Sequence, residues 1–286
     1  MATYSQAGAK FGFATLRTAL ITFPLMVAIQ EMCARIGFVT GEGLVSNIRK
    51  HYSLTILYIV LFFCIPGIIL NIGADIAGMG AVTHLLFPQV PAYIFSILFT
   101  LILTVAIVFL PYRKIAAVLK YLCLTLLLYL IIPFLVKPNL LHVLKSTFIP
   151  KIHFNKEFIS ILVAILGTTI SPYLFFWQAT MVAEDKKHLK KIVVNIRMIN
   201  EVKFDIHIGM LFSNLIMYFI ILTTGATLFN AGIHHIDTVE QAAKALEPLA
   251  GRFAYLLFAL GVIGTGFLAI PVLTGCLSYS LSATFN

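Results

Sequence analysis

Long apolar runs and short polar segments alternate along the whole chain. The apolar runs cover residues 18–39, 54–86, 92–110, 115–136, 158–183, 204–229 and 254–281. A helix that crosses a bilayer needs about 20 predominantly apolar residues, and each run is close to that length or exceeds it. The pattern therefore predicts an all-α, multi-pass membrane protein in which residues 1–286 form a single transmembrane domain.

Composition supports this class and argues against a soluble domain. The 286 residues are 60% hydrophobic and 11% charged, with a mean hydropathy of +0.99, whereas a soluble domain carries about 25% charged residues. The formal charge of +9 does not indicate nucleic-acid binding, because the basic residues gather in short segments between apolar runs, as they do in oriented membrane proteins. The cysteines lie in or beside apolar runs without metal-site spacing, so we interpret them as packing residues: Cys33, Cys64, Cys123 and Cys276.

The positions of the basic residues predict an orientation. If the segment before Arg49 ends inside the cell, alternation places the loops around Arg49, Arg113 and Lys187 in the cytoplasm. The loops around His153 and His235 then face outward. The greater number of lysines and arginines on the first side agrees with the positive-inside rule.

The run over residues 158–183 carries the clearest local signal for function. The segment from Gly167 to Pro172 interrupts it with the sequence GTTISP. Proline has no N–H to donate and clashes one turn back, so the sequence predicts a helix broken over residues 167–172. Broken backbone at membrane depth occurs where it is buried in protein or lines a cavity, and transporters use it to bind ions. The alternative is a simple proline kink between packed helices in which Thr168, Thr169 and Ser171 bond back to their own backbone.

Asp75 is the only acidic residue in the run over residues 54–86. A carboxylate at membrane depth is costly and therefore a candidate for a functional residue. The alternative is a structural position near the headgroups or against a neighbouring helix. Adjacent histidines such as His234 and His235 do not share a helix face, so a loop is favoured over a metal site there. No cluster of His, Asp and Glu and no Ser–His pair lies deep in a run, so the sequence does not predict an enzyme.

Four segments together resemble one family of membrane proteins. They are ATYSQAGAKFG at residues 2–12, QEMCARIGFVTG at residues 30–41, GADIAGMGA at residues 73–81 and GTTISPYLFFWQA at residues 167–179. In this order they are similar to motifs of the natural resistance-associated macrophage protein (Nramp) family of divalent-metal transporters. The resemblance implies a LeuT-like inverted-repeat helix bundle, here from the second half of helix 1 to about helix 8.

In that family two broken helices share the metal, and the resemblance assigns roles to residues of the second break. It implies that Thr168 and Ser171 bind the metal, with Gly167 and Pro172 forming the break itself. Tyr173, Gln178 and Asp75 would line the path of a proton or of a gate.

The chain also departs from the family pattern. Ser171 stands where the family has a thioether ligand, and an oxygen ligand suits Mg²⁺, Ca²⁺ and Mn²⁺ better than softer metals. Gln178 stands at a histidine position and cannot carry a proton near neutral pH. The Asp-Pro-Gly-Asn segment that supplies the other half of the metal site would precede Met1. We therefore expect residues 1–286 to be an internal portion of a transporter, with an incomplete metal site and no appreciable metal transport alone.

The sequence thus predicts a secondary transporter that moves divalent cations of the Mn/Fe/Mg class across a bacterial plasma membrane by alternating access. The metal would be the transported substrate, with lipid as the surroundings, no separate cofactor and no nucleic acid. Proton symport is left open by the residues, as is the oligomeric state. The alternatives are a LeuT-fold transporter of an organic solute such as an amino acid, and an inactive membrane subunit.

Overall fold

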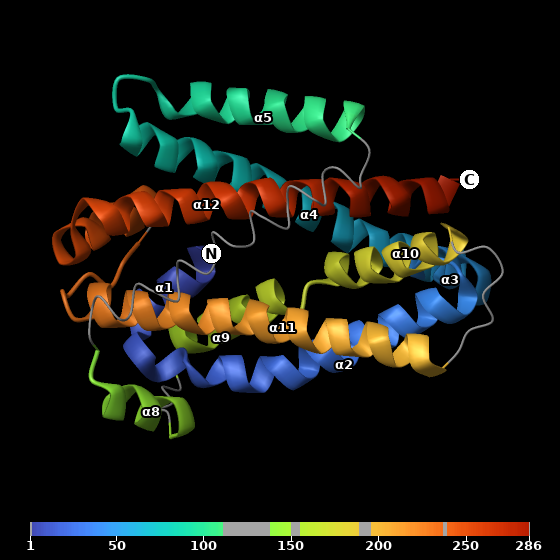
Figure 1. Cartoon of the computed structure of the whole chain (residues 1–286), viewed down its shortest axis with the longest axis horizontal. Helices are drawn as coiled ribbons and strands as arrows, with labels where there is room; N and C mark the ends of the chain where they lie inside the picture. Colours follow the sequence, from blue (N-terminus) through green and yellow to red (C-terminus); the bar gives the residue numbers. More distant parts are fainter. Residues whose placement is uncertain (1, 111–137, 150–154, 189–195, 237–238, 286) are drawn as a thin grey trace. The chain divides into compact units, whose positions relative to one another are not determined.

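A computed structural model describes residues 2–110, 138–149, 155–188, 196–236 and 239–285. All regular elements within those ranges are helices (Figure 1). Six candidate spans among the described residues are long and apolar enough to cross a membrane. The chain is therefore an all-α, multi-pass membrane protein, as predicted. The expected span over residues 115–136 lies outside the described residues.

Several helices extend further than the apolar runs. In chain order they are α1 (Ala2–Phe11), the 3₁₀-helix η1 (Gly12–Thr15), α2 (Arg17–Thr40), α3 (Leu44–His51), α4 (Leu54–Leu86), α5 (Ala92–Phe109), α8 (Leu140–Phe148), α9 (Lys156–Thr169), α10 (Pro172–His188), α11 (Ile196–Thr224), the π-helix η2 (Gly225–Phe229) and α12 (Val239–Phe285). The two largest extensions are at the starts of α11 and α12, where polar residues join the helix. Helical backbone satisfies its own hydrogen bonds, so it can continue past the apolar core of the membrane.

The chain divides into two compact units. The first comprises Met1–Ile21, Gly73–Thr168 and Ser213–Pro271, and the second comprises Thr22–Ile72, Thr169–Phe212 and Val272–Asn286. Several long helices therefore contribute to both units. That residues 1–286 form a single transmembrane domain stays a prediction.

In the first unit, α1 packs closely against the end of α11 and η2. A Cβ on Gly8 would overlap the hydroxyl of Thr224, so the two backbones approach as closely as only glycine permits. Gly12 has φ +57° and lies where the chain turns from α1 into η1. Residues with a Cβ rarely adopt this backbone conformation. The fully buried Ala9 and Leu228 belong to the apolar core beside this contact.

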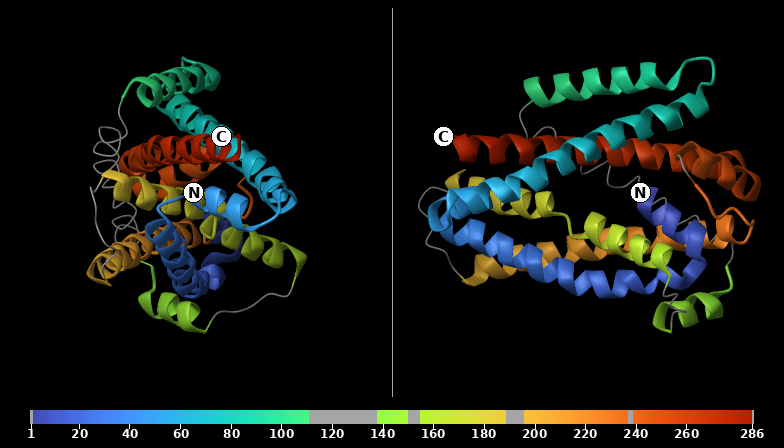
Figure 2. Two further views of the ribbon diagram at one scale, coloured as in Figure 1. Left: turned by 90° about the vertical axis from the view of Figure 1, so that its right-hand side faces the viewer. Right: turned by 180° about the vertical axis from the view of Figure 1, so that it is seen from behind.

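The second half of α4 and the antiparallel α5 form a hairpin in the same unit (Figures 1 and 2). A Cβ on Gly80 would overlap Ser96, and the Ser96 hydroxyl donates to the carbonyl of Ile76 across the pair at 3.3 Å. His84 Nδ1 lies 2.7 Å from the carbonyl of Val90 and ties the connecting turn. Small residues thus replace bulky apolar contacts at this interface, which is common where lipid provides no hydrophobic driving force.

In the second unit, α2 packs against α10 through small residues. A Cβ on Gly37 would overlap the backbone carbonyl of Ala179, and one on Gly43 would lie 2.6 Å from the hydroxyl of Thr180. Ala34, Phe38, Val182 and Ile206, which come from α2, α10 and α11, form a buried apolar cluster in this unit. The glycines set how closely α10 approaches α2.

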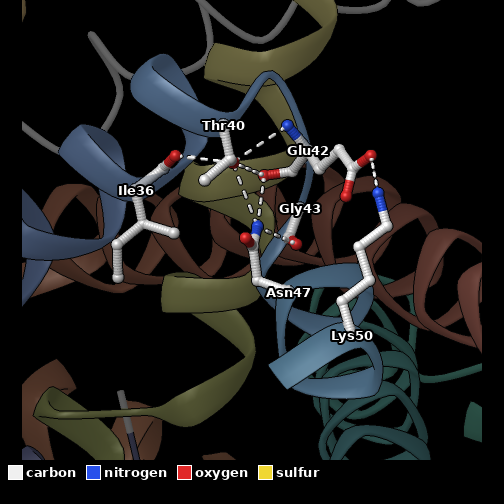
Figure 3. Close-up of polar contacts among 6 residues, drawn as sticks. All are labelled: Ile36, Thr40, Glu42, Gly43, Asn47 and Lys50. Atoms are coloured by element: carbon white, nitrogen blue, oxygen red, sulfur yellow. Dashed lines mark hydrogen bonds and ion pairs between the residues drawn. The ribbon is translucent and has the colours of Figure 1, made fainter. Parts of the chain in front are cut away.

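The turn between α2 and α3 is closed by a polar network (Figure 3). The Thr40 hydroxyl oxygen accepts from the backbone N–H of Glu42 at 3.2 Å and from Asn47 Nδ2 at 3.0 Å. Asn47 Nδ2 also donates to the carbonyls of Glu42 at 3.2 Å and Gly43 at 3.0 Å. Lys50 forms an ion pair with Glu42. These contacts satisfy backbone groups of Glu42 and Gly43 in the turn that follows α2.

We expect Gly37→Ala to destabilise the protein, because the added methyl group meets the backbone of α10 rather than a flexible side chain. Overpacking of this kind costs about 1–3 kcal/mol. Gly209→Ala is the matched control, since a Cβ on Gly209 in α11 has no neighbour within 4 Å. Thermal unfolding of the purified variants in detergent measures both. Equal stability of the two variants would contradict the close approach of α2 and α10.

Candidate functional site

The broken membrane helix that the sequence predicts is present, but the break is shorter than expected. α9 continues through Thr169 and α10 begins at Pro172, so only Ile170 and Ser171 are non-helical. The expectation that all of residues 167–172 leave the helix is wrong. Gly167 lies within the last turn of α9 rather than in the break.

Local chemistry explains where the break falls. Pro172 occupies the first position of α10, where a missing N–H costs nothing. The residue before a proline is disfavoured in helical geometry, which places the interruption at Ser171. The Thr168 hydroxyl donates back to the carbonyls of Ala164 at 2.8 Å and Ile165 at 3.1 Å, which supports the last turn of α9.

The boundary between the two compact units falls between Thr168 and Thr169, directly before the break. Among the predicted site residues, Thr168 and Asp75 belong to the first unit, whereas Ser171, Tyr173 and Gln178 belong to the second. The structure thus brings Ser171, Tyr173 and Gln178 together: Ser171 lies just before α10, and the other two lie in its first turns. The predicted roles of all five in binding or gating stay predictions.

Ser171 and Tyr173 lie at the start of α10 among contacts within the second unit. Ser171 is only 1% exposed, and its carbonyl accepts from the N–H of Leu174 at 3.1 Å. The carbonyl of Tyr173 accepts from the thiol of Cys276 on α12 at 3.2 Å. A Cβ on Gly275 would overlap the indole of Trp177, so α12 also packs closely on the next turn of α10.

Gln178 has a specific partner that the sequence did not reveal. Its Oε1 accepts from Nε2 of Gln30 on α2 at 3.2 Å, and Gln30 is 5% exposed. A buried amide in an apolar helix needs hydrogen-bond partners, because each unpaired group costs about 1–3 kcal/mol. Gln30 lies within the resemblance to the family and within the apolar run over residues 18–39. A polar residue within an apolar run is the sequence signal that could have identified Gln30, but only the folded chain shows its partner.

Asp75 is half-buried in α4, one turn before Met79. Met79 is fully buried and occupies the space that a Cβ on Gly266 of α12 would need. Asp75 forms no ion pair with a charged side chain among the residues that the structure describes. A carboxylate at membrane depth, one turn from a tightly packed contact, is consistent with a residue that takes up a proton or a cation.

The half-helix before the break is joined to α1 within the first unit. Lys10 Nζ lies 3.1 Å from a carboxylate oxygen of Glu157 in the first turn of α9. The rings of Phe11 and Phe158 meet edge to face with centroids 5.0 Å apart. Nothing in the sequence pairs these residues, and the sequence analysis missed both contacts.

The chemistry at the break is that of neutral oxygen donors. No group of three or more His, Cys, Asp or Glu residues able to hold a metal occurs in the described parts of the chain. Hydroxyls and backbone carbonyls, such as those of Thr168 and Ser171, suit hard divalent cations. A site of this kind binds a passing ion weakly unless a carboxylate contributes charge.

An all-α, multi-pass membrane protein with a helix interrupted at membrane depth defines a class in which ion carriers are common. The sequence matches the family described as "Natural resistance-associated macrophage protein-like" over residues 1–286. The chain therefore belongs to the Nramp family, and the resemblance drawn from its motifs is confirmed.

Curated relatives agree with this assignment at low identity. The chain is 25% identical over 270 residues to the divalent metal cation transporter MntH of Bradyrhizobium diazoefficiens, and 24% identical over 270 residues to that of Klebsiella pneumoniae strain 342. Each alignment covers 93% of this chain, and 60% and 63% of the respective relative. The MntH of Caldanaerobacter subterraneus is 31% identical over 140 residues, 46% of this chain and 30% of the relative. The chain spans about 60% of the length of the first two relatives.

The contact between Gln30 and Gln178 can be tested with a double-mutant cycle. Gln178→Leu removes the acceptor of a buried amide, so we expect a loss of about 1–3 kcal/mol of stability. Gln30→Leu/Gln178→Leu should lose less than the sum of the single changes, because no unpaired amide of this pair remains. Chemical unfolding in detergent measures the cycle. Strict additivity of the two changes would refute the pairing.

Proposed function

We propose that the protein is a secondary transporter that moves divalent metal cations across a membrane by alternating access. The observation that carries the proposal is the interruption of a membrane helix at Ile170–Ser171, at the boundary of two compact units, in a member of the Nramp family. Relatives at 24–25% identity are named divalent metal cation transporters, which supports the same substrate class here. The membrane we propose is the cytoplasmic membrane of a bacterium.

In this proposal the metal is the substrate and is held at the break by the oxygens of Thr168 and Ser171. The buried position of Ser171 supports this role, because burial strips water from an ion and strengthens each remaining oxygen contact. Tyr173 and Gln178 follow on α10. A change in their contacts would accompany the opening or closing of the transport path. The pairing of Gln178 with Gln30 on α2 supports a gating role rather than direct binding.

Transport itself is tested by reconstituting the protein into vesicles that contain a metal-sensitive dye. We expect Mn²⁺ to enter when residues 1–286 are joined to an upstream segment ending in Asp-Pro-Gly-Asn and to further C-terminal helices, with Mg²⁺ or Fe²⁺ competing. Residues 1–286 alone should show no appreciable flux. Amino acids added in excess should leave the rate unchanged. Inhibition by an amino acid would favour a transporter of organic solutes instead, and an absence of any flux through the joined protein would favour an inactive membrane subunit.

Ser171→Met tests the metal ligand. A thioether favours softer transition metals than a hydroxyl does, so we expect the variant to prefer Cd²⁺ over Mg²⁺ or Mn²⁺ several-fold more than the parent protein. Ser213→Met is the control, because Ser213 is an exposed serine on another helix, α11. Competition of each metal against Mn²⁺ uptake measures the preference. Equal selectivity in the parent and in Ser171→Met would remove Ser171 from the binding site.

Asp75→Asn tests proton coupling. Asparagine has nearly the shape of aspartate but cannot take up a proton, so a coupled transporter should lose the acceleration of metal uptake by an inward proton gradient. Basal uptake without a gradient should be affected less. Asp205→Asn, at an exposed position of α11, is the matched control. Undiminished acceleration in Asp75→Asn would exclude Asp75 from the proton path.

A further inference from the structure

The short helix α8 in the first unit has two sides that differ sharply in exposure. Val143 and Thr147, one turn apart, are buried. Another side carries four large apolar side chains that are between 54% and 76% exposed: Leu140, Leu141, Leu144 and Phe148. Residues four apart share one face of a helix, so these side chains form a continuous patch. A patch of this kind indicates an interaction surface.

The helical repeat divides α8 into three sectors. At about 100° per residue, the exposed apolar side chains fill one sector, and the buried side chains border it on one flank. The polar side chains lie on its other flank: His142, Lys145 and Ser146. Lys145 is the only charged residue of this helix at neutral pH apart from any charge on His142. Three such sectors fit a helix that contacts protein, hydrocarbon and water at the same time.

Specific contacts fix the orientation of α8. The hydroxyls of Thr147 and of Tyr218 on α11 lie 2.8 Å apart. The ring of His142 meets that of Phe13 in η1 edge to face, with centroids 5.3 Å apart. The Asn139 side chain accepts from the N–H of His142 at 3.2 Å and caps the start of the helix. α8 therefore lies beside the turn that joins α1 to α2, with a defined side facing away from the protein (Figure 2).

These contacts place α8 near one end of the membrane-spanning helices. η1 ends at Thr15, and the span α2 begins at the exposed Arg17. A basic side chain at the end of a span extends to the headgroups. Tyr218 lies 14 residues after Phe204, where the apolar run of α11 begins. That is about 21 Å of helix against a hydrocarbon thickness of about 30 Å. Both markers place α8 between the headgroups and the outer hydrocarbon.

The neighbouring spans of the same unit expose apolar side chains at this level. Leu20 and Ile21 in the first turns of α2 are exposed, as is Ile159 in the first turn of α9. Exposed apolar side chains on the spans of a multi-pass protein face lipid, which therefore reaches the level of α8. With nine residues, about 13.5 Å of helix, α8 is too short to cross a bilayer.

We propose that α8 is an interfacial helix that inserts its apolar sector into the adjoining lipid leaflet. Its four exposed apolar side chains lie among the acyl chains, while Lys145 and Ser146 face headgroups and water. Amphipathic helices of this type bury their apolar face about 5–10 Å into the boundary between headgroups and acyl chains. Because α8 contacts η1 and α11, its insertion links the leaflet to the turn between α1 and α2. Insertion does not require transport, so it can be measured in residues 1–286.

The test uses a single nitrobenzoxadiazole label on cysteine-free protein reconstituted into phosphatidylcholine vesicles. Leu144→Cys carries the label in the apolar sector, and Ser146→Cys is the matched position in the polar sector. Leu101→Cys, at an exposed position in the middle of α5, is the deep reference. The quenchers are iodide on both sides of the membrane and phospholipids with a nitroxide at a shallow or a deep acyl position.

We expect the shallow nitroxide to quench the Leu144→Cys label several-fold more strongly than the Ser146→Cys label, and iodide to show the reverse order. The Leu101→Cys label should respond more to the deep nitroxide. Strong quenching of the Leu144→Cys label by iodide would overturn the proposal, because the helix would then lie in water. Protection of that label from both quenchers would also overturn it, because protein, such as a second copy of the chain, would then cover the patch.

A second substitution tests whether the apolar sector itself causes insertion. Leu141→Glu adds a carboxylate, which hydrocarbon disfavours, so it should reduce shallow-nitroxide quenching of the Leu144→Cys label several-fold. Ser146→Glu, in the polar sector, is the matched control and should leave that quenching unchanged. Circular dichroism of each labelled variant checks that the protein keeps its helix content. Equal quenching in a folded Leu141→Glu variant and in its parent would contradict insertion by this sector.

Discussion

The hydrocarbon core of a membrane cannot hydrogen-bond to backbone, and this constraint shapes the broken helix on which the structure depends. An interruption between α9 and α10 frees polar groups that an intact helix would satisfy. The structure keeps the interruption to Ile170 and Ser171, buries Ser171, and bonds the nearby carbonyls of Ser171 and Tyr173 to Leu174 and Cys276. The break is thus stabilised by hydrogen bonds of its own.

Each half of the broken helix is fixed to its own unit by a different kind of contact. α9 is joined to α1 by the ion pair of Lys10 with Glu157 and by two phenylalanine rings. α10 is fixed by close backbone approach to α2 at Gly37, and by the amide pair of Gln178 and Gln30. The ion pair of Lys10 with Glu157 is partly exposed and weak, since ion pairs at surfaces contribute about 0–1 kcal/mol, whereas the Phe158 ring is buried. The contacts of α10 with α2 depend on how closely the two helices fit together, so they resist small displacements of α10.

Membership of the Nramp family and the residues at the break give different information. The family match covers the whole chain, which settles the class of protein. Ser171 at the break, with Tyr173 and Gln178 in the first turns of α10, offers hydroxyl and amide groups. Family membership therefore gives the class of protein, whereas the roles of these individual side chains in selectivity or proton handling stay predictions.

Much of the architecture could be predicted from the sequence, because a membrane helix depends on about 20 consecutive apolar residues and needs no distant partner. The interruption near Pro172 was predictable for the same reason, since a proline acts on its own helix. Its length was not, because whether Gly167–Thr169 stay helical depends on how the end of α9 packs and where Thr168 bonds.

The contacts that give single polar residues their roles were decided only by the tertiary structure. Gln178 was visible in the sequence as a substituted histidine, but its partner Gln30 lies on another helix. Glu31 and Arg35 form an ion pair and are four residues apart on one helix, a spacing that can be read from the sequence. Lys203, which joins them from α11, could not be found in that way. Local rules fix which segments become helices, while pairing between helices depends on how their faces meet after folding.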